Sequence, residues 1–213
     1  TCKKLEKHFR EPQDIEFTIE KGKFYLLQTR TAKMSAAALI KTSVDMVKEK
    51  LIDKNKALIR IPAQQLEALL HKTIDQNKVK EYKQLTKGIA ASPGAASGIV
   101  VFDVKKAIAM GEDNTKVILI RKETKPEDVP AFFSSEGILT SQGGKSSHAA
   151  IVSRGMGKPC IVGSTELKID YDTKKCQANG IIISEGDSIT IDGSTGIVYI
   201  GNIPTVEPQV TED

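Results

Sequence analysis

The sequence contains no tryptophan, and only 5% of its 213 residues are aromatic. Its three cysteines, Cys2, Cys160 and Cys176, have the spacing of neither a disulfide framework nor a zinc site. No apolar run approaches the roughly 18 residues of a membrane-spanning helix, and no secretory signal is recognisable. We therefore expect an aliphatic core, reduced thiols, a cytoplasmic location and no membrane partner.

The net charge of +4 is unevenly distributed along the chain. Lysine and arginine outnumber acidic residues over residues 1–87, whereas acidic residues are in excess thereafter. A basic segment can bind nucleic acid, but these lysines are scattered and lack the interleaved aromatic side chains of a single-strand binder. We interpret the basic part as a solvated helical surface and expect no nucleic-acid partner.

The most informative stretch of the sequence reads SQGGKSSHAAIVSRGMGKPCIVG. Gly143 and Gly144 interrupt regular structure, and Ser146 and Ser147 stand where a helix N-cap is expected. His148 would then lie in the first turn of a short helix. The stretch therefore predicts a histidine at a helix N-terminus, behind a glycine pair that lets a ligand approach the backbone.

This placement suits phosphoryl chemistry. Free N–H groups and the positive end of the helix dipole favour an anion. The same field disfavours a protonated imidazolium, so a neutral ring could attack phosphorus and carry the phosphoryl group covalently. The alternative is a capping or core histidine beside a glycine turn, and the residues alone do not decide between the two.

Residues 143–163 resemble the phosphohistidine signature of the phosphoenolpyruvate-utilising enzymes. Within that family, the tail RGMGKPC is most similar to the pyruvate, phosphate dikinases. Two positions depart from the usual dikinase pattern, because Lys145 replaces a methionine and Ser146 replaces a threonine. Arginine is common at the first of these positions in the related phosphoenolpyruvate synthases.

The resemblance implies a role for each residue of the motif. His148 would be the catalytic carrier of the phosphoryl group, and Gly143, Gly144, Ser146 and Ser147 would support its binding. Ser146 also matches the hydroxyl residue that is phosphorylated for regulation in plant dikinases, which implies a regulatory site at this position.

A second motif, DIEFTIEKGKFYLLQTR, spans residues 14–30 and predicts a β-hairpin with a glycine turn. Alternation puts Asp14 and Glu16 on one face of the first strand, and Gln28 and Arg30 on one face of the second. Paired carboxylates can hold Mg²⁺ together with nucleotide phosphates. The residues alone favour the alternative, an amphipathic hairpin with a polar outer face.

The hairpin resembles the C-terminal end of the ATP-grasp nucleotide-binding domain of the same dikinases. The resemblance implies that Asp14 and Glu16 face metal and phosphate, and that Gln28 and Arg30 lie near the nucleotide. Mg²⁺ with ATP is the implied cofactor.

The sequence downstream of the hairpin predicts helices and then alternating strands and helices. Apolar residues three to four apart predict a helix over residues 36–51, Asp53 is placed to cap a second, and Pro62 to open a third that includes Leu69. The lysine-rich residues 74–87 are interpreted as a linker. Further on, continuous or alternating apolar runs predict short strands at residues 117–121, 137–140, 181–184, 187–192 and 197–200.

The expected fold class is α/β, with four parts in sequence. Residues 1–33 would be the hairpin remnant of an ATP-grasp domain, and residues 34–86 a helical segment with linker. Residues 87–203 would form a swivelling β/β/α phosphohistidine domain, and residues 204–213 a linker tail. The abrupt, charged start without methionine suggests that the sequence is a segment of a longer protein. We expect the segment by itself to be inactive.

The resemblance also implies a reaction. ATP and inorganic phosphate would react with the histidine to release AMP and diphosphate, and the phosphohistidine would convert pyruvate to phosphoenolpyruvate. These partners would bind through flanking domains of a parent enzyme, expected to be a homo-oligomer. The alternatives are a phosphoenolpyruvate synthase, against which RGMGKPC argues, and a phosphocarrier such as enzyme I of the sugar phosphotransferase system, which has no nucleotide hairpin.

Overall fold

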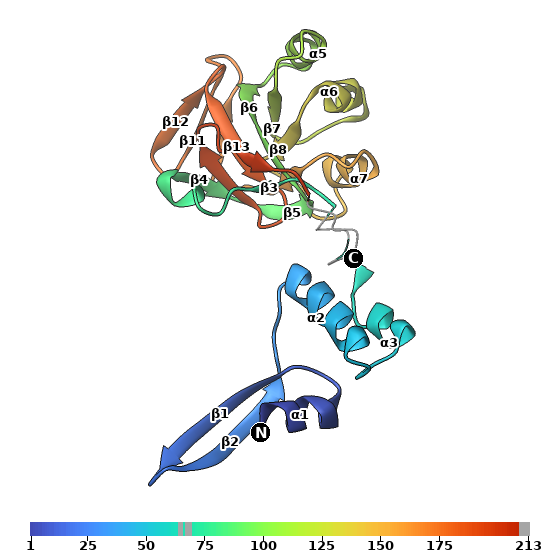
Figure 1. The fold of residues 1–213 in the computed structure, drawn as a ribbon. Helices are drawn as coiled ribbons and strands as arrows, with labels where there is room; N and C mark the ends of the chain where they lie inside the picture. Colours follow the sequence, from blue (N-terminus) through green and yellow to red (C-terminus); the bar gives the residue numbers. More distant parts are fainter. Residues whose placement is uncertain (64–65, 67–69, 209–213) are drawn as a thin grey trace. The chain divides into compact units, whose positions relative to one another are not determined.

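The computed structural model describes residues 1–63, 66 and 70–208 of the chain. These residues form two compact units, the second of which begins at Leu70. Both helices and strands are present (Figure 1), so the α/β class expected from the sequence is confirmed. Within the described part of the chain, no helix is both long and apolar enough to cross a bilayer.

The first unit contains a β-hairpin and short helices. Its elements are α1 (Cys2–Phe9), β1 (Gln13–Glu20), β2 (Lys23–Thr31), α2 (Ala36–Lys48) and α3 (Lys54–Ile59). The hairpin turns at Lys21 and Gly22, whose φ values of 51° and 73° are those of a two-residue turn that matches the twist of the strands. The hairpin expected from residues 14–30 is confirmed.

One face of the hairpin is apolar and exposed. Phe17 pairs with Leu26 and Ile19 pairs with Phe24 across the two strands. The rings of Phe17 and Phe24 stack with their centroids 5.1 Å apart. These four side chains are nevertheless 37–64% exposed, so the hairpin presents a hydrophobic surface that its own unit does not cover.

Two helices of the first unit, α2 and α3, begin at residues whose side chains cap them. The Asp53 carboxylate accepts the Lys56 N–H at 2.8 Å at the start of α3, as expected from the sequence. Ser35 caps α2 in the same way, by accepting the Ala38 N–H at 3.4 Å. The expected third helix is only partly described, and its residue Leu69 lies outside the described residues.

An eight-stranded mixed sheet forms the centre of the second unit (Figure 1). Its strand order is β4-β14-β13-β6-β7-β8-β9-β5, and β6 to β9 run parallel. The strands of this sheet are β4 (Gln84–Lys87), β5 (Ile89–Ser92), β6 (Ala95–Val101), β7 (Val117–Arg121), β8 (Gly137–Thr140), β9 (Cys160–Val162), β13 (Ser188–Asp192) and β14 (Ile197–Ile200).

Two further layers cover the central sheet, one on each face. On one face lie three helices, namely α5 (Val104–Glu112), α6 (Val129–Ser134) and α7 (His148–Gly155) (Figure 1). On the other lies a three-stranded antiparallel sheet of β10 (Lys168–Asp170), β11 (Lys175–Ala178) and β12 (Ile181–Ser184). Two short 3₁₀ helices, η1 (Val79–Glu81) and η2 (Pro126–Asp128), complete the connections.

Alternation along the central strands explains the three layers. In β7, Ile118 and Ile120 join the core under the small sheet, whereas Val117 and Leu119 join the core under the helices. All four side chains are fully buried. A strand buried on both faces has a continuous apolar sequence rather than an alternating one, and residues 117–120 of β7 are all apolar.

The structure corrects the interpretation of residues 74–87 as a linker. Residues 84–87 form β4 at one end of the central sheet, where they pair with β14, and Leu85 is fully buried. Thr73–Ile74 forms β3, which pairs with β15 (Thr205–Val206) in the expected linker tail. The second unit therefore extends beyond residues 87–203 on both sides. The sequence did not indicate these strands, because isolated apolar residues among lysines form too weak a pattern to predict strands this short.

We predict that the contact between α5 and α6 tolerates no side chain at Gly111. A Cβ there would overlap the Ser134 carbonyl oxygen and lie 2.6 Å from the Ser134 Cβ. Gly111→Ala should therefore destabilise the chain by about 1–3 kcal/mol in urea unfolding. Gly155→Ala is the matched control, because the space around it is open, and it should leave stability unchanged or raise it by less than about 1 kcal/mol. Equal unfolding midpoints for the two variants would contradict this packing.

Candidate active site

The histidine motif forms the loop between β8 and α7, at the carboxyl end of the parallel strands. α7 begins at His148, and the Ser147 hydroxyl caps it by accepting the Ala150 N–H at 3.4 Å. The structure confirms that the histidine lies in the first turn of a capped helix. It also identifies Ser147, rather than Ser146, as the cap.

The two glycines of the loop have different surroundings. Gly143 has a φ of 104°, and a Cβ there would lie 3.0 Å from the Ser147 Cβ. A Cβ on Gly163, at the end of the next strand, would lie 2.5 Å from the Gly143 carbonyl oxygen. Gly144, by contrast, faces open space. Gly143 therefore fixes the path of the loop, whereas Gly144 leaves room beside the backbone.

Arg154, in the last turn of α7, holds the loop in place. Its Nε donates to the carbonyl oxygen of Ala91 in β5 at 2.9 Å, and its Nη2 donates to the carbonyl oxygen of Lys145. The guanidinium thus joins the histidine loop, the helix and the sheet. Sequence reasoning did not single out Arg154. The sequence did contain a signal for this role, because an arginine six positions after the histidine falls near the end of the expected helix. Its planar side chain can donate several hydrogen bonds at once.

His148 is partly buried, and its Nε2 atom is inaccessible to solvent. Among the described residues, no group hydrogen-bonds to this nitrogen. Buried polar atoms without a partner are rare in folded proteins, so they call for an explanation. This ring nitrogen forms no hydrogen bond that an external group would have to displace, but such a group can reach it only when the atoms that cover it move. Ser146, two residues earlier, is exposed.

The hairpin brings its four predicted residues to one face. Asp14 lies opposite Arg30 and Glu16 opposite Gln28 in the strand register, and cross-strand partners point to the same side of a sheet. Arg30 Nε donates to Asp14 Oδ2 at 2.9 Å, and this hydrogen bond raises the pKa of Arg30 above its usual value. Both side chains are more than half exposed, so the pair contributes little to stability.

The carboxylates of the hairpin do not form a metal cluster by themselves. In the described ranges, no group of three or more His, Cys, Asp or Glu side chains is arranged to hold a metal ion. Asp14 and Glu16 share one face, but Asp14 is already paired with Arg30. Two carboxylates suffice for Mg²⁺ only when other oxygen ligands, such as nucleotide phosphates and water, complete the coordination.

The buried cysteines are not candidates for nucleophilic chemistry. Burial raises the pKa of Cys160 to about 11 and that of Cys176 to about 12. Both thiols therefore stay protonated at neutral pH, whereas the thiolate is the reactive form. Cys160 lies in the core between the sheet and the helices, which matches its interpretation as a small buried residue.

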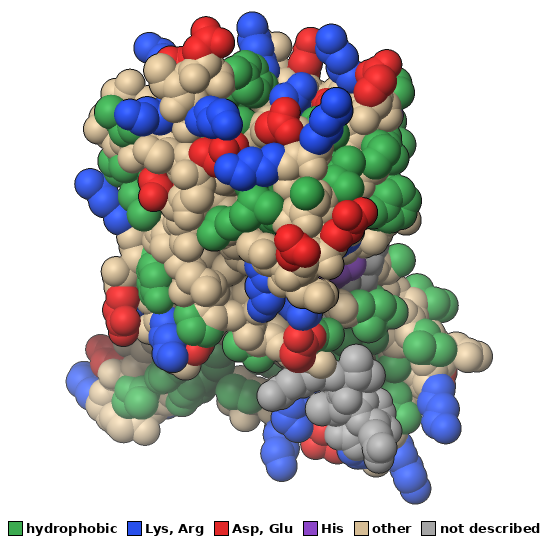
Figure 2. Space-filling view, turned by 90° about the horizontal axis from the view of Figure 1, so that it is seen from above, with side chains coloured by type: hydrophobic (Ala, Val, Ile, Leu, Met, Phe, Trp, Pro, Cys, Tyr) green, Lys and Arg blue, Asp and Glu red, His purple; other side chains and the backbone are tan. Residues whose placement is uncertain are grey.

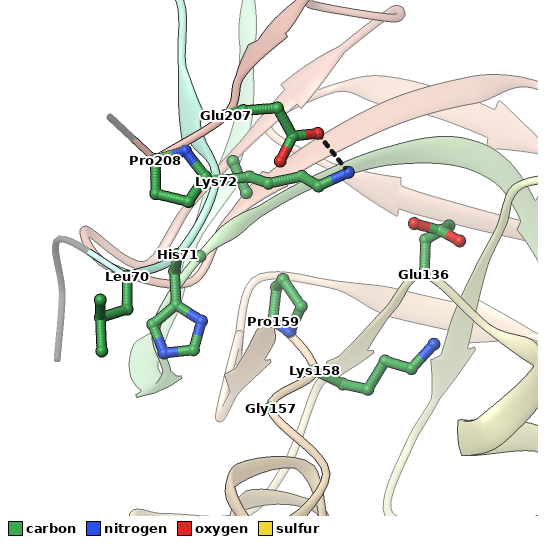
Figure 3. Close-up of a pocket in the computed structure, with 11 residues that line it drawn as sticks. Leu70, His71, Lys72, Glu136, Gly157, Lys158, Pro159, Glu207 and Pro208 are labelled. Atoms are coloured by element: carbon green, nitrogen blue, oxygen red, sulfur yellow. Dashed lines mark ion pairs between the residues drawn. The ribbon is translucent and has the colours of Figure 1, made fainter. Parts of the chain in front are cut away.

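A pocket of about 260 Å³ lies beyond the other end of α7 (Figure 3). His71 lines it, between Leu70 and β3. Lys72 forms an ion pair with Glu207 at 2.8 Å, and Lys158 Nζ donates to the Ser135 carbonyl oxygen at 2.6 Å. Both lysine side chains that line this pocket are therefore already bound to groups of the protein itself.

Comparisons with known proteins match both motifs. The family of the pyruvate phosphate dikinase AMP/ATP-binding domain matches residues 1–51, and that of the mobile domain of the PEP-utilising enzymes matches residues 113–196. Three relatives are each described as "Pyruvate, phosphate dikinase". The protein from Entamoeba histolytica is 53% identical over 98% of this chain and 23% of its own length. The protein from Rickettsia prowazekii is 50% identical over 100% of this chain and 24% of its own length. The protein from Clostridium symbiosum is 47% identical over 98% of this chain and 24% of its own length.

The chain thus spans about a quarter of the length of the curated relatives that it matches, and the match extends over nearly all of its residues, including both the hairpin and the histidine loop. It belongs to the pyruvate, phosphate dikinase family of the PEP-utilising enzymes.

Proposed function

We propose that this chain is the phosphoryl-carrier portion of a pyruvate, phosphate dikinase, with His148 as the carrier. The observation on which the proposal rests is the buried, unpartnered Nε2 of His148 at the start of α7. In this proposal ATP and inorganic phosphate react with that nitrogen, which forms a bond to phosphorus while AMP and diphosphate leave. The phosphoryl group then passes from nitrogen to the enolate oxygen of pyruvate, and the histidine is regenerated.

The start of α7 suits the charge that this chemistry develops. The first backbone N–H groups of a helix have no partner within it, and they point at an anion held at its end. Fixed dipoles of this kind stabilise a transferring phosphoryl group without having to reorganise during the reaction. Ser147 fixes where the helix begins, Gly144 leaves open space beside the loop backbone, and Arg154 anchors the loop to the sheet.

For the hairpin we propose a role at the nucleotide. Its exposed apolar face supports the view that it packs within a larger domain, as the match to the nucleotide-binding family suggests. Asp14 and Glu16 would hold Mg²⁺, which would neutralise charge on the nucleotide phosphates. Gln28 and Arg30, on the same face, would donate hydrogen bonds to the nucleotide.

A carrier that serves two reaction sites has to move between them, and we propose that the second unit swivels as one body. The pairing of β3 with β15 supports this idea, because the first and last strands of the unit are neighbours. Motion of a whole domain requires hinges outside its rigid core. The buried, unpaired cysteines would suit a reducing cytoplasm, which is the compartment that we propose.

The two half-reactions of the proposed mechanism allow the roles of the histidine loop and the hairpin to be tested separately. In the full-length enzyme, His148→Asn should abolish both ATP–AMP exchange and pyruvate–phosphoenolpyruvate exchange, because the same nitrogen serves both. Glu16→Gln should slow only the ATP–AMP exchange, by roughly 10²–10³. Isotope-exchange rates measured in parallel check the prediction.

Two further variants are controls for this experiment. His71→Asn changes a histidine of the pocket in Figure 3, and Glu20→Gln changes an acid on the same strand as Glu16. Both should retain both exchanges. An active His148→Asn enzyme would exclude the histidine as carrier, and equal loss of both exchanges in a folded Glu16→Gln enzyme would exclude a separate nucleotide role for the hairpin.

The two loop glycines should differ in their tolerance of a methyl group. Gly143→Ala forces a side chain into a positive-φ position against Ser147, whereas Gly144→Ala meets open space. Labelling of His148 from ATP in the full-length enzyme should fall by about tenfold or more in Gly143→Ala, because the histidine shifts from its productive position. It should change much less in Gly144→Ala, and the opposite order would contradict the loop geometry.

Ser146 is exposed two residues before His148, so we propose it as a site where phosphorylation would regulate transfer. A phosphate there would add a charge of about −1.5 to −2 that repels the incoming phosphoryl group. In the full-length enzyme, Ser146→Asp should block labelling of His148, whereas Ser146→Thr should be nearly silent. Wild-type labelling rates in Ser146→Asp would remove the electrostatic basis of the idea.

A further inference from the structure

A second cavity borders the histidine loop on the side of the small sheet. Its volume is about 340 Å³, and it is lined by Lys122, Ser141, Gln142, Thr165, Leu167, Lys168 and Ile169. Lys122 follows the end of β7 and Ser141 the end of β8. The cavity therefore opens at the carboxyl edge of the parallel strands, which is where α/β sheets characteristically bind ligands.

The lining of this cavity is cationic. It contains two lysines and no acidic residue. In the described part of the chain, neither Lys122 nor Lys168 forms an ion pair with a carboxylate. The pocket of Figure 3 differs, because its two lysines are accompanied by Glu136 and Glu207. Over the face shown in Figure 2, too, Lys and Arg side chains are interspersed with Asp and Glu. The cavity therefore holds two ammonium groups with no carboxylate in its lining.

The framework of the cavity is fixed, and it is connected to the histidine loop. The Lys122 N–H donates to the Tyr171 hydroxyl at 2.8 Å, and the Lys122 carbonyl oxygen accepts the Gln142 N–H at 2.9 Å. Leu167 and Ser141 are buried and form its floor. Gln142 directly precedes Gly143, so a ligand in this cavity would contact the same loop that presents His148.

We propose that this cavity is an oxyanion site that binds a phosphate group. Two ammonium groups supply the charge, and the Thr165 hydroxyl and the Gln142 side-chain amide supply further donors of hydrogen bonds, whereas the Ser141 hydroxyl already donates to the Lys122 carbonyl oxygen at 3.4 Å. Its place beside the histidine loop gives it a purpose that rests on the proposed function, namely to hold a phosphate-bearing reactant or product at the loop that carries His148. The chemistry fits inorganic phosphate and the phosphate of an organic ester alike.

The test is an amide NMR titration of the 213-residue chain with inorganic phosphate at constant ionic strength. We expect saturable shifts at residues 122, 141–142 and 165–168. The double variant Lys122→Gln/Lys168→Gln should bind at least about tenfold more weakly, because it loses two charged donors. Lys105→Gln, an exposed lysine on α5, is the matched control and should bind as the wild-type chain does.

Further titrations test which phosphate compound the cavity binds and whether phosphate binds at this cavity rather than at the histidine. Tighter binding of phosphoenolpyruvate or AMP than of inorganic phosphate would identify an organic phosphate as the occupant. His148→Asn should retain phosphate binding at this cavity, so the result does not depend on whether the histidine is a carrier. Shifts confined to residues 143–149, or equal weakening in Lys105→Gln and the double variant, would overturn the proposal.

Discussion

Burial of the parallel strands on both faces is the constraint on which the second unit depends. β7 has helices on one side and the small sheet on the other, so none of its faces is free for a ligand. Chemistry can then occur only where the strands end. The loop after β8, which carries His148, and the cavity beside the end of β7 both lie at that edge. The candidate reactive groups of this unit therefore lie in loops rather than on the strands.

The histidine loop shows how a short segment is held for chemistry. A free loop would spend most of its time in conformations that cannot react, and ordering it has an entropic cost of about 1–2 kcal/mol per residue. Here that cost is met during folding, through the close approach of Gly143 and Gly163 and the two carbonyl contacts of Arg154. The backbone is fixed, while the Nε2 atom of His148 keeps no partner.

Much of this arrangement could be predicted from the sequence, because its strongest signals are local. The hairpin has a Lys-Gly turn between alternating strands, the Asp53 cap lies directly before its helix, and β7 is a continuous apolar run. β4, β10 and β11 could not be found in this way. Each is three or four residues long, and each is stabilised by partners far away in the sequence, such as β14 for β4. The pattern of neighbouring residues does not indicate which distant strand a segment will pair with.

The same limit applies to the site. His148 and Ser147 were identified because helix caps depend on neighbouring residues. The contact of Arg154 with Ala91 joins positions 63 residues apart, and the cavity at Lys122 and Lys168 combines three separate segments. Spacing along the chain cannot show that these groups meet. What the sequence could supply was the type of residue, and the fold determined which of them became neighbours.

The pairing of β3 with β15 has an implication for how such a unit can be rearranged. Its entry and exit strands run side by side and antiparallel, so the polypeptide arrives and departs at one place. A domain with adjacent ends can be inserted into a surface loop of another protein without stretching it. The second unit therefore has the geometry of a transplantable cassette, which could be excised, grafted or circularly permuted with little disturbance to its core.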